Sequence, residues 1–453
     1  MRPPFSFEGD LKRRDYALAS IGIYLVQPLF VLIARAACGQ PPTWPWWFLF
    51  NPLRALVDPL RVGAPDWSVP PSLAILAMTL TVVIDGLLIA LAYRRARTAG
   101  MDPNLAALAI FPLGQILVIG WLSLAPDRAA PPVEPATANP PPTLRSIAWG
   151  LLAGAILCVA TVALSTLGFE TYGSALFIAS PFVIALVTAY LVNRGHELSA
   201  GRTSAIVFGA LGLGALALIG FAFEGLICLI IASPLIAAMG FFGGLFGRAL
   251  ARGQGRRRGG SLKSVAIVPL LLLGEVVLPP RAQFSSVESV DVAAPPAAVW
   301  DSVVHMGPIP DAPPAPFRWG LSYPMRGRIF GSGVGAIRQG VFSTGVAYER
   351  VTDWRPNQAL SFVVLSDAPT MRELSPYAHV NAPHVKGYFH TIDARFTLTP
   401  LADGETRLTL ATRHELDLEP ALYWIPFAEW ATHANKVRVL NHFKQQAEAS
   451  VAR

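Results

Sequence analysis

Charged residues are scarce in this sequence. Only 14% of its 453 residues are Asp, Glu, Lys or Arg, whereas soluble domains carry about 25%, and 53% are hydrophobic. The mean hydropathy of +0.46 excludes an ordinary soluble protein and indicates a membrane protein. Residues 1–280 hold 20 Lys and Arg against 13 Asp and Glu, whereas residues 281–453 hold 16 of each. The basic residues flank apolar runs, so they predict membrane orientation rather than nucleic-acid binding.

Cysteine is also rare. Cys38, Cys158 and Cys228 lie in or beside apolar segments, and residues 281–453 contain none. This distribution excludes a disulfide framework and a cysteine-rich zinc site in the C-terminal part. The polar start "MRPPFSFEGDLKRRDY" is not followed promptly by a small-residue cleavage site, so we expect no cleavable signal.

Apolar runs long enough to cross a 30 Å hydrocarbon core recur up to residue 280. A Pro-rich loop at 127–145 divides a first membrane region, 1–126, from further transmembrane helices at 146–280. The Trp-rich stretch 42–60 is typical of the membrane interface. We place spans near 16–36, 72–93, 104–124, 146–168, 172–192, 203–222 and 226–247, with a shorter run at 264–279.

The run 104–124 decides the orientation. If it crosses the membrane, most Lys and Arg residues in the loops fall on the outer side, against the positive-inside rule. If it enters and returns, the basic clusters at 12–14, 94–97 and 248–263 share the cytoplasmic side. The "FPLG" at 111–114 can break a helix there, and we favour this topology over a plain crossing. It predicts an inner (plasma) membrane protein whose C-terminal domain faces the outer, periplasmic side.

Acidic residues inside apolar runs need a partner or a cavity. For Asp85 and Glu275 the alternatives are an ion or proton path and a helix-packing residue, and we favour packing. Glu224, at a tight turn between two spans, is expected to reach the interface. The small residues at 208–220 and 240–247 predict close helix packing.

The first 126 residues resemble a small bacterial inner-membrane family of unknown function, numbered 805. The stretches that carry the resemblance are "FSFEGDLKRRDY" (5–16) and "YRRARTAGMDPNLAALAIFPLGQILVIGWLSLAP" (93–126), in which Phe7, Gly9, Arg13 and Tyr16 keep the family pattern. Asp10 stands where the family has Arg, and Ala96 and Thr98 depart from its second cluster. The resemblance implies a membrane location and no activity.

From residue 287 the apolar residues follow a period of two, which is typical of strands. "VDVAA" (290–294) leads through Pro295 and Pro296 into a short helix, whose Trp300 we expect to pack against the sheet. Further strands are predicted at 345–354, 360–365, 386–401 and 406–416, the last two joined by a hairpin at Asp403–Gly404. A long helix follows at about 420–450, with an expected apolar stripe and a kink at Pro426. We expect the apolar stripe of that helix at Phe427, Trp430, Ala434, Val437, Leu440, Ala447 and Val451.

This order resembles the START-like or SRPBCC superfamily, which includes polyketide cyclase/dehydrase-like proteins. The resemblance is carried by "VDVAAPPAAVWDSV" (290–303), "VTDWRPNQALSF" (351–362) and "FTLTPLADGETRLTL" (396–410), and it covers 284–453. A membrane-tethered bacterial group within the superfamily shares "FEGLICLIIASPL" (223–235), "MRELSP" (371–376) and "PHVKGYF" (383–389). The expected fold is therefore an α-helical multi-span membrane domain plus an α+β helix-grip domain, a curved antiparallel sheet around a long C-terminal helix.

The resemblance implies that the domain holds a membrane lipid or another hydrophobic small molecule near the bilayer surface. Two alternatives stay open: a cyclase/dehydratase-like enzyme acting on a hydrophobic substrate, and a transporter or sensor gated by the soluble domain. The sequence assigns no reaction, and we expect no nucleic acid, cofactor or metal. The ligand-binding candidates are Arg338, Arg372, Tyr377, His384, Arg413, Trp424 and His433, and the catalytic candidates are Glu349, Glu373 and His390.

Two local patterns are weaker signals. His379, His384 and His390 lie within twelve residues, but their spacing fits neither a helical metal pair nor a zinc ribbon. The glycine-rich run 326–340 contains G-x-G-x-G without a following helix, which favours a bulged hairpin over a phosphate-binding loop.

Overall fold

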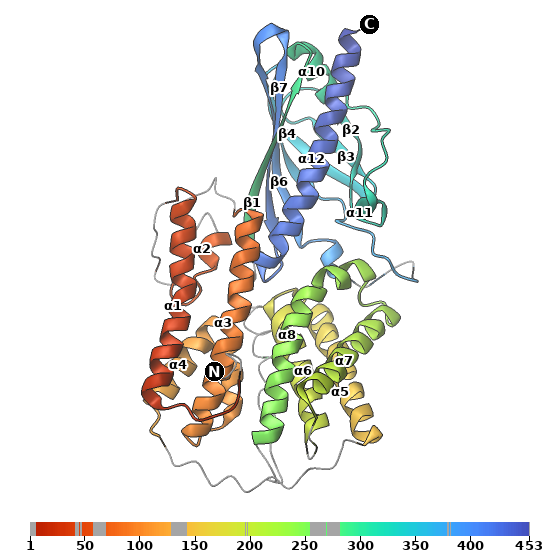
Figure 1. The fold of residues 1–453 in the computed structure, drawn as a ribbon. Coiled ribbons are helices and arrows are strands. Elements are labelled where there is room, and N and C mark those ends of the chain that lie inside the picture. Colours follow the sequence, from red (N-terminus) through yellow and green to blue (C-terminus); the bar gives the residue numbers. More distant parts are fainter. Residues whose placement is uncertain are drawn as a thin grey trace. The chain divides into compact units, whose positions relative to one another are not determined.

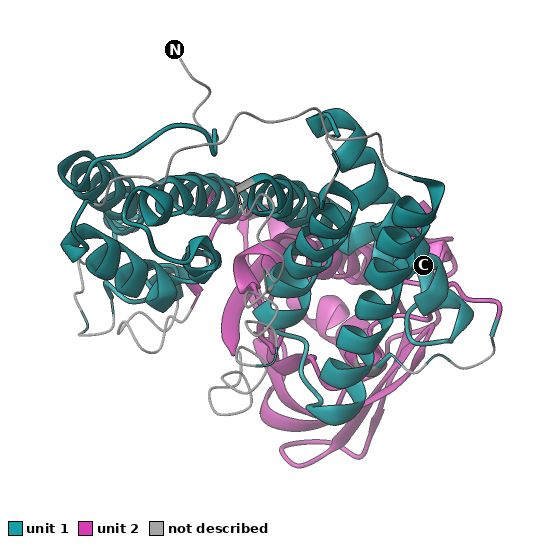
Figure 2. Ribbon diagram, turned by 90° about the horizontal axis from the view of Figure 1, so that it is seen from below, with its two compact units in different colours: residues 1–56, 75–279, 377–382 teal, residues 57–74, 280–376, 383–453 magenta. Residues whose placement is uncertain are grey.

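A computed structural model describes residues 6–40, 45, 48–57, 69–127, 143–194, 196, 198–253, 269, 281–377, 380 and 382–452. The chain divides into two compact units, coloured separately in Figure 2 (Figures 1 and 2). The membrane unit comprises residues 1–56, 75–279 and 377–382. The helix-grip unit comprises residues 57–74, 280–376 and 383–453.

The membrane unit is built from helices. Six of its helical segments are long and apolar enough to span a membrane, which confirms a multi-pass protein. The predicted segments 127–145 and 264–279 lie mostly outside the described residues, whereas the stretch 42–60 is described at 45 and 48–57, where it forms turns and the short helix α2 (Arg54–Val57). The helices are α1 (Arg13–Ala37), α2 (Arg54–Val57), α3 (Pro71–Thr98), η1 (Pro103–Ile110), α4 (Pro112–Leu124), α5 (Leu144–Ala163) continued by η2 (Leu164–Gly168), η3 (Ala175–Ala179) continued by α6 (Ser180–Asn193), α7 (Ala200–Gly220) and α8 (Leu226–Gly253).

The segment from η1 to α4 enters the unit and returns to the same end of α3. Midway, the Gln115 side-chain amide of α4 donates to the Asp85 carboxylate in the middle of α3, at 2.7 Å. At its end, the carbonyl of Leu122 accepts from Arg95 Nε at 3.0 Å, close to where α3 stops. Pro112 begins α4 directly after the extended Phe111, so the break falls at the predicted "FPLG". The expected re-entrant path is thus what the contacts describe.

Two acidic side chains of this unit are engaged in packing contacts. Asp85 is buried and bonded to Gln115, which favours the packing interpretation over an ion path. Glu224 does not reach an interface as expected: it is buried and accepts a hydrogen bond of 2.6 Å from the hydroxyl of Tyr172. The small residues predicted to allow close packing do so, since Gly243 and Gly247 of α8 lie directly against carbonyl groups of Phe182 and Leu186 in α6.

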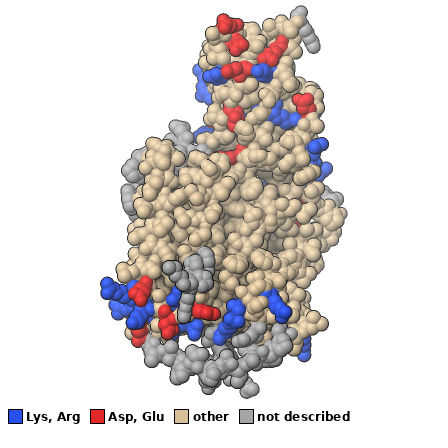
Figure 3. Space-filling view, viewed as in Figure 1, with Lys and Arg blue, Asp and Glu red and all other residues tan. Residues whose placement is uncertain are grey.

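Basic residues gather at one end of the membrane unit. Arg13 begins α1, Arg97 lies in the last turn of α3, Arg145 lies in the first turn of α5, and Arg252 lies in the last turn of α8. Because successive spans run in opposite directions, these positions share one end. Figure 3 shows Lys and Arg there, below a broad belt without charged residues. This distribution is the one expected for a cytoplasmic face.

The helix-grip unit is a seven-stranded antiparallel sheet with one long helix, as predicted. The strand order is β1-β7-β6-β5-β4-β3-β2, and the helix α12 runs against the sheet, mostly along β1 (Figure 1). The elements are β1 (Ala282–Val292), α10 (Pro296–Val304), α11 (Ala315–Arg318), β2 (Pro324–Phe330), β3 (Ile337–Phe342), β4 (Gly345–Arg355), β5 (Ala359–Ser366), η5 (Pro383–Val385), β6 (Phe389–Pro400), η6 (Ala402–Gly404), β7 (Thr406–Leu416) and α12 (Ala421–Val451).

Proline and glycine set the corners of this unit. Pro295 caps α10, and Trp300 in that helix meets Trp354 of β4 edge to face, with ring centroids 5.3 Å apart.

The glycine-rich run 326–340 is the predicted hairpin between β2 and β3, with an irregular register near Pro324. Its Gly331, Gly333 and Gly335 have φ values of 87°, 83° and 92°, in a region that side chains disfavour. These glycines therefore serve the turn rather than a phosphate.

The buried face of α12 differs from the predicted stripe. Phe427, Trp430 and Val451 are 41%, 45% and 54% exposed, whereas Lys436 is 4% exposed. The line facing the sheet instead passes through Lys436, Leu440, Phe443 and Ala447, at spacings of three and four residues. The prediction was correct for Leu440 and Ala447, which are buried, and wrong for Phe427, Trp430 and Val451. It missed Lys436 because a periodicity search counts only apolar residues, and here a lysine occupies an inward position. The helix also continues through Pro426.

Candidate functional site

The candidate site lies on the sheet face that α12 covers. Strand residues alternate between the two faces, and the even-numbered residues of β1 and β7 point inward. Most of this face is apolar, and Phe396 of β6 packs edge to face on Phe443 of α12. The same core holds Leu408, Leu410 and Leu440, all nearly inaccessible to solvent. Polar side chains on this inner face are therefore exceptions that require an explanation.

Lys436 is the first exception. Its ammonium group donates to the hydroxyl of Ser286 in the middle of β1. Ser286 pairs in register with Thr412 of β7, so hydroxyl groups of two adjacent strands lie below the helix. Burial lowers the pKa of Lys436 to about 8, and the carboxylates of Glu288 and Glu429 partly oppose that shift. Glu288 itself is bonded to His433 Nδ1 at 2.5 Å.

His414 lies next to this lysine on β7. Its ring stands between Phe284 and Phe389, with centroid distances of 5.0 and 5.1 Å, and its Nε2 is 2.8 Å from the hydroxyl of Thr412. Burial, assisted by the charge of Lys436, lowers the pKa of His414 to about 3. The imidazole is therefore neutral at physiological pH, and Lys436 is the cation of this cluster.

A second polar pair lies on β3 and β4. Arg338 and Glu349 face each other across the ladder and form a buried ion pair. Burial raises the pKa of Glu349, and Arg338 opposes the shift. The guanidinium carbon lies 4.7 Å from the ring centre of Phe362. A side chain at Gly327 would meet Arg338 and Met306 at about 3 Å, so glycine there makes room for the guanidinium.

The other acid–base candidates form separate pairs. Glu373 Oε1 lies 3.2 Å from His384 Nε2, and both side chains are almost fully buried. His390 Nδ1 lies 3.2 Å from the carboxylate of Asp367, which also accepts the backbone N–H of Thr391. The three catalytic candidates thus have three different partners. The hydrogen bonds of His390 join it to Asp367 and to the backbone carbonyl of Gly387.

Several predicted ligand-binding residues lie away from the inner face. Arg413 is on the outer face, where it pairs with Asp393, because odd-numbered residues of β7 point outward. Arg372 is exposed in the loop after β5. Tyr377 belongs to the membrane unit, where its hydroxyl donates to the carbonyl of Gly220 at 2.6 Å. Trp424 is buried near the start of α12, next to Tyr423, and His433 lies at the edge of the polar cluster. His379 lies outside the described residues.

Sequence reasoning missed Lys436, His414, Ser286 and Thr412. A signal existed for two of them: in "TRLTLATRHEL" the alternation that turns Leu408 and Leu410 inward also turns Thr412 and His414 inward. For Lys436, its four-residue spacing from Leu440 was the available signal. Ser286 could be found only through its pairing with β7.

Comparisons with known proteins give likeness to solved structures. No family model matches this chain, and no curated protein matches it. The aromatase/cyclase Zhui of a Streptomyces strain is 17% identical, with a TM-score of 0.24, over 37% of this chain and 96% of its own. A protein of Nitrosomonas europaea is 14% identical, with a TM-score of 0.24, over 37% of this chain and 97% of its own. One of Nitrosospira multiformis is 15% identical, with a TM-score of 0.23, over 37% and 99%.

Proposed function

We propose that this chain is an integral membrane protein whose START-like unit binds an apolar molecule with an anionic or carbonyl-bearing end. A membrane lipid or a fatty acid has this chemistry. The observation that carries the proposal is the Lys436 amine, buried on a mostly apolar inner face. No reaction is assigned.

The hydrogen bonds of Lys436 support a ligand with a polar end. An ammonium group has three N–H donors, and among the described residues its hydrogen-bond acceptor is the hydroxyl of Ser286. Glu288, the neighbouring carboxylate, is bonded to His433 instead. Burying a cation without a close carboxylate costs free energy. A ligand carboxylate or phosphate beside Lys436 offsets that cost and gives the lysine a role at this inward position.

The ladder between β5 and β6 stops short of the start of β6. Pairing between β5 and β6 ends at Val363 and Asp393, although β6 begins earlier, at Phe389. Phe389 and Val364, on the inner face beyond that point, are only half-buried. Apolar side chains with a few placed polar groups are typical of sites for hydrophobic ligands.

A binding measurement on the full-length protein tests the proposal. We expect the delipidated protein in detergent to bind a fluorescent fatty acid, and the variant K436M to bind it at least tenfold more weakly. K444M is the matched control. Lys444 lies two turns away on α12, and its amine donates a hydrogen bond to the backbone carbonyl of Asp291. Equal affinities in K436M and the unaltered protein would contradict the role of Lys436. Binding of no member of a broad lipid panel would contradict the function itself.

The placement of this unit on the periplasmic face stays part of the proposal. The basic end of the membrane unit supports a cytoplasmic position for Arg145. In a background with Cys38, Cys158 and Cys228 replaced by Ser, we expect a membrane-impermeant maleimide to label D403C in intact cells with a permeabilised outer membrane. R145C is expected to react only after lysis. Labelling of D403C only after lysis would place the unit in the cytoplasm.

A further inference from the structure

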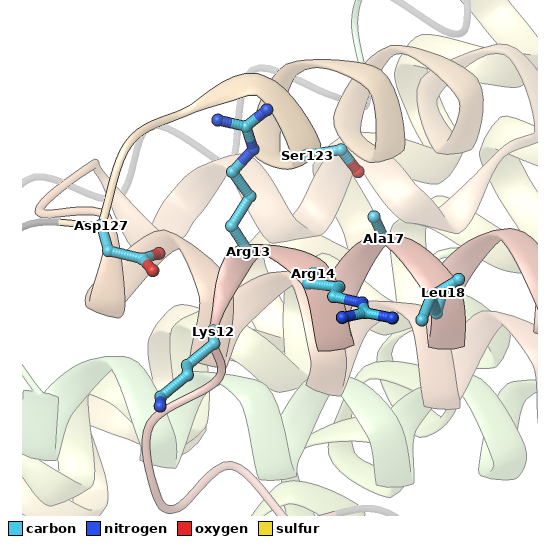
Figure 4. Close-up of a pocket in the computed structure, with 7 residues that line it drawn as sticks. All are labelled: Lys12, Arg13, Arg14, Ala17, Leu18, Ser123 and Asp127. Carbon is cyan, nitrogen blue, oxygen red and sulfur yellow. The ribbon is translucent and has the colours of Figure 1, made fainter.

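A second ligand site lies in the membrane unit, apart from the helix-grip unit. Where α1 begins and α4 ends, a hollow of about 500 Å³ opens to the surface. Figure 4 shows its lining, with Arg13 extending from α1 toward the end of α4 that carries Ser123. The lining residues are Lys12, Arg13, Arg14, Ala17, Leu18, Ser123 and Asp127.

The charges around this hollow are unbalanced. Asp127 is the acidic residue of the lining, and its carboxylate is already paired with Arg95 of α3. Lys12, Arg13 and Arg14 have no ion pair or side-chain hydrogen bond with any described residue. They also lie at the N-terminus of a 25-residue helix, where the backbone dipole is positive and cations are unfavourable. An anion bound there relieves both repulsions.

The helix backbone adds donors to the same hollow. The first-turn N–H groups of α1 have no earlier helical carbonyl to bond to, and the side chain of Lys12, the N-cap residue, does not cap them. Cationic side chains and free N–H groups together form a phosphate-binding set.

The surface that continues from the hollow is apolar. On α1, Leu18, Leu25 and Leu29 are 64%, 47% and 57% exposed. On α4, Leu117, Trp121 and Leu124 are 58%, 63% and 74% exposed. A free phosphate ion would make no use of these side chains. Acyl chains would lie along them, with Trp121 at the depth where tryptophan favours the headgroup region.

We propose that this hollow binds the phosphate headgroup of an anionic glycerophospholipid, with its acyl chains along the exposed faces of α1 and α4. The three cations and the first-turn N–H groups of α1 hold the phosphate. The Arg95–Asp127 pair keeps the carboxylate at the rim from repelling it. This lipid is distinct from the ligand of the helix-grip unit, since none of the lining residues belongs to that unit.

Native mass spectrometry of the full-length protein, titrated with dioleoyl phosphatidylglycerol, tests the proposal. Each basic residue near a membrane surface contributes about fivefold in affinity for an anionic lipid, so we expect the double variant R13Q/R14Q to bind about 25-fold more weakly. The matched control R145Q/R202Q removes two exposed arginines from the same end of the unit and should stay within about twofold. An equal loss in both double variants would overturn the site, because it would indicate general attraction to that face.

Two further measurements test the identity of the bound anion. Phosphatidylcholine should bind at least tenfold more weakly than phosphatidylglycerol. Release of the lipid by millimolar inorganic phosphate would show an ion site and overturn the lipid assignment.

Discussion

The two units treat a buried cation in opposite ways. In the membrane unit, Arg95 bonds to the carbonyls of Leu122 and Ala125 and to the carboxylate of Asp127. In the helix-grip unit, Lys436 is similarly buried, but its acceptor among the described residues is one hydroxyl. A cation surrounded by acceptors from its own chain stabilises the fold, whereas one with spare donors is kept for something else. The contrast is the basis on which we propose a structural role for Arg95 and a binding role for Lys436, and each role can be tested.

The largest expected effect concerns His414, the neutral neighbour of Lys436. Its pKa of about 3 in the folded protein lies below the unfolded value of 6.5, so unfolding takes up a proton between these values. The free energy of unfolding should therefore fall as pH falls from 6.5 toward 3, by roughly 5 kcal/mol in total. Urea unfolding of the full-length protein at several pH values, followed by tryptophan fluorescence, measures it.

The variant H414F isolates this effect. Phenylalanine fits between Phe284 and Phe389 and cannot be protonated, so acid sensitivity should decrease strongly. H305Q is the control, because His305 is 72% exposed beside Asp301. Unchanged acid sensitivity in H414F would show that other groups cause it.

Removing the structural cation should also have a large effect. R95Q removes the donor to the buried carbonyls of Leu122 and Ala125, which costs about 1–3 kcal/mol for each acceptor left unpaired, whereas the carboxylate of Asp127 is half exposed and can bond to water. The melting temperature in detergent should fall markedly, while R145Q, at an exposed position of the same end, should change it little. If R95Q and R145Q melt alike, Arg95 does not hold α4 against α3, and the comparison of the two cations fails.

The binding cation should behave in the opposite way. K436M removes a charge that is costly to bury, so the free energy of unfolding should stay the same or rise by about 1 kcal/mol while ligand binding is lost. In the unaltered protein the unfolded state holds more protons between pH 8 and 10.5. Stability should therefore rise with pH in that window, by roughly 3 kcal/mol at most, and this rise should be absent in K436M. A K436M protein that unfolds much more easily would make Lys436 structural.

The smallest expected effect is at Asp85. D85N keeps the shape and retains an oxygen that can accept the bond from Gln115, so the stability measured by thermal melting should change by less than about 1 kcal/mol. D85L leaves the Gln115 amide buried without that acceptor, and it should cost about 1–3 kcal/mol. A large effect of D85N and a small one of D85L would favour a role beyond packing.

Local patterns could be predicted from the sequence, and long-range partners could not. Pro295–Pro296 and Asp403–Gly404 set corners through their own backbone preferences, so the strand–helix order was predicted correctly. Six of the seven long apolar runs likewise correspond to the six spans, and the seventh, 104–124, forms η1 and α4. Lys436 and Ser286 meet across 150 residues, and no local pattern encodes that contact. The stripe on α12 was correct only at Leu440 and Ala447 for the same reason, since the interior there includes a lysine.

The re-entrant path of η1 and α4 has a consequence for every residue that follows it. A hydropathy plot counts this segment as one more crossing, and a single extra crossing inverts the assigned side of all later loops. Reporter fusions placed before residue 102 and after residue 127 will both indicate the same side of the membrane. A topology map of this protein is therefore reliable only when reporters bracket that segment, because an error there propagates unchanged to the C-terminus.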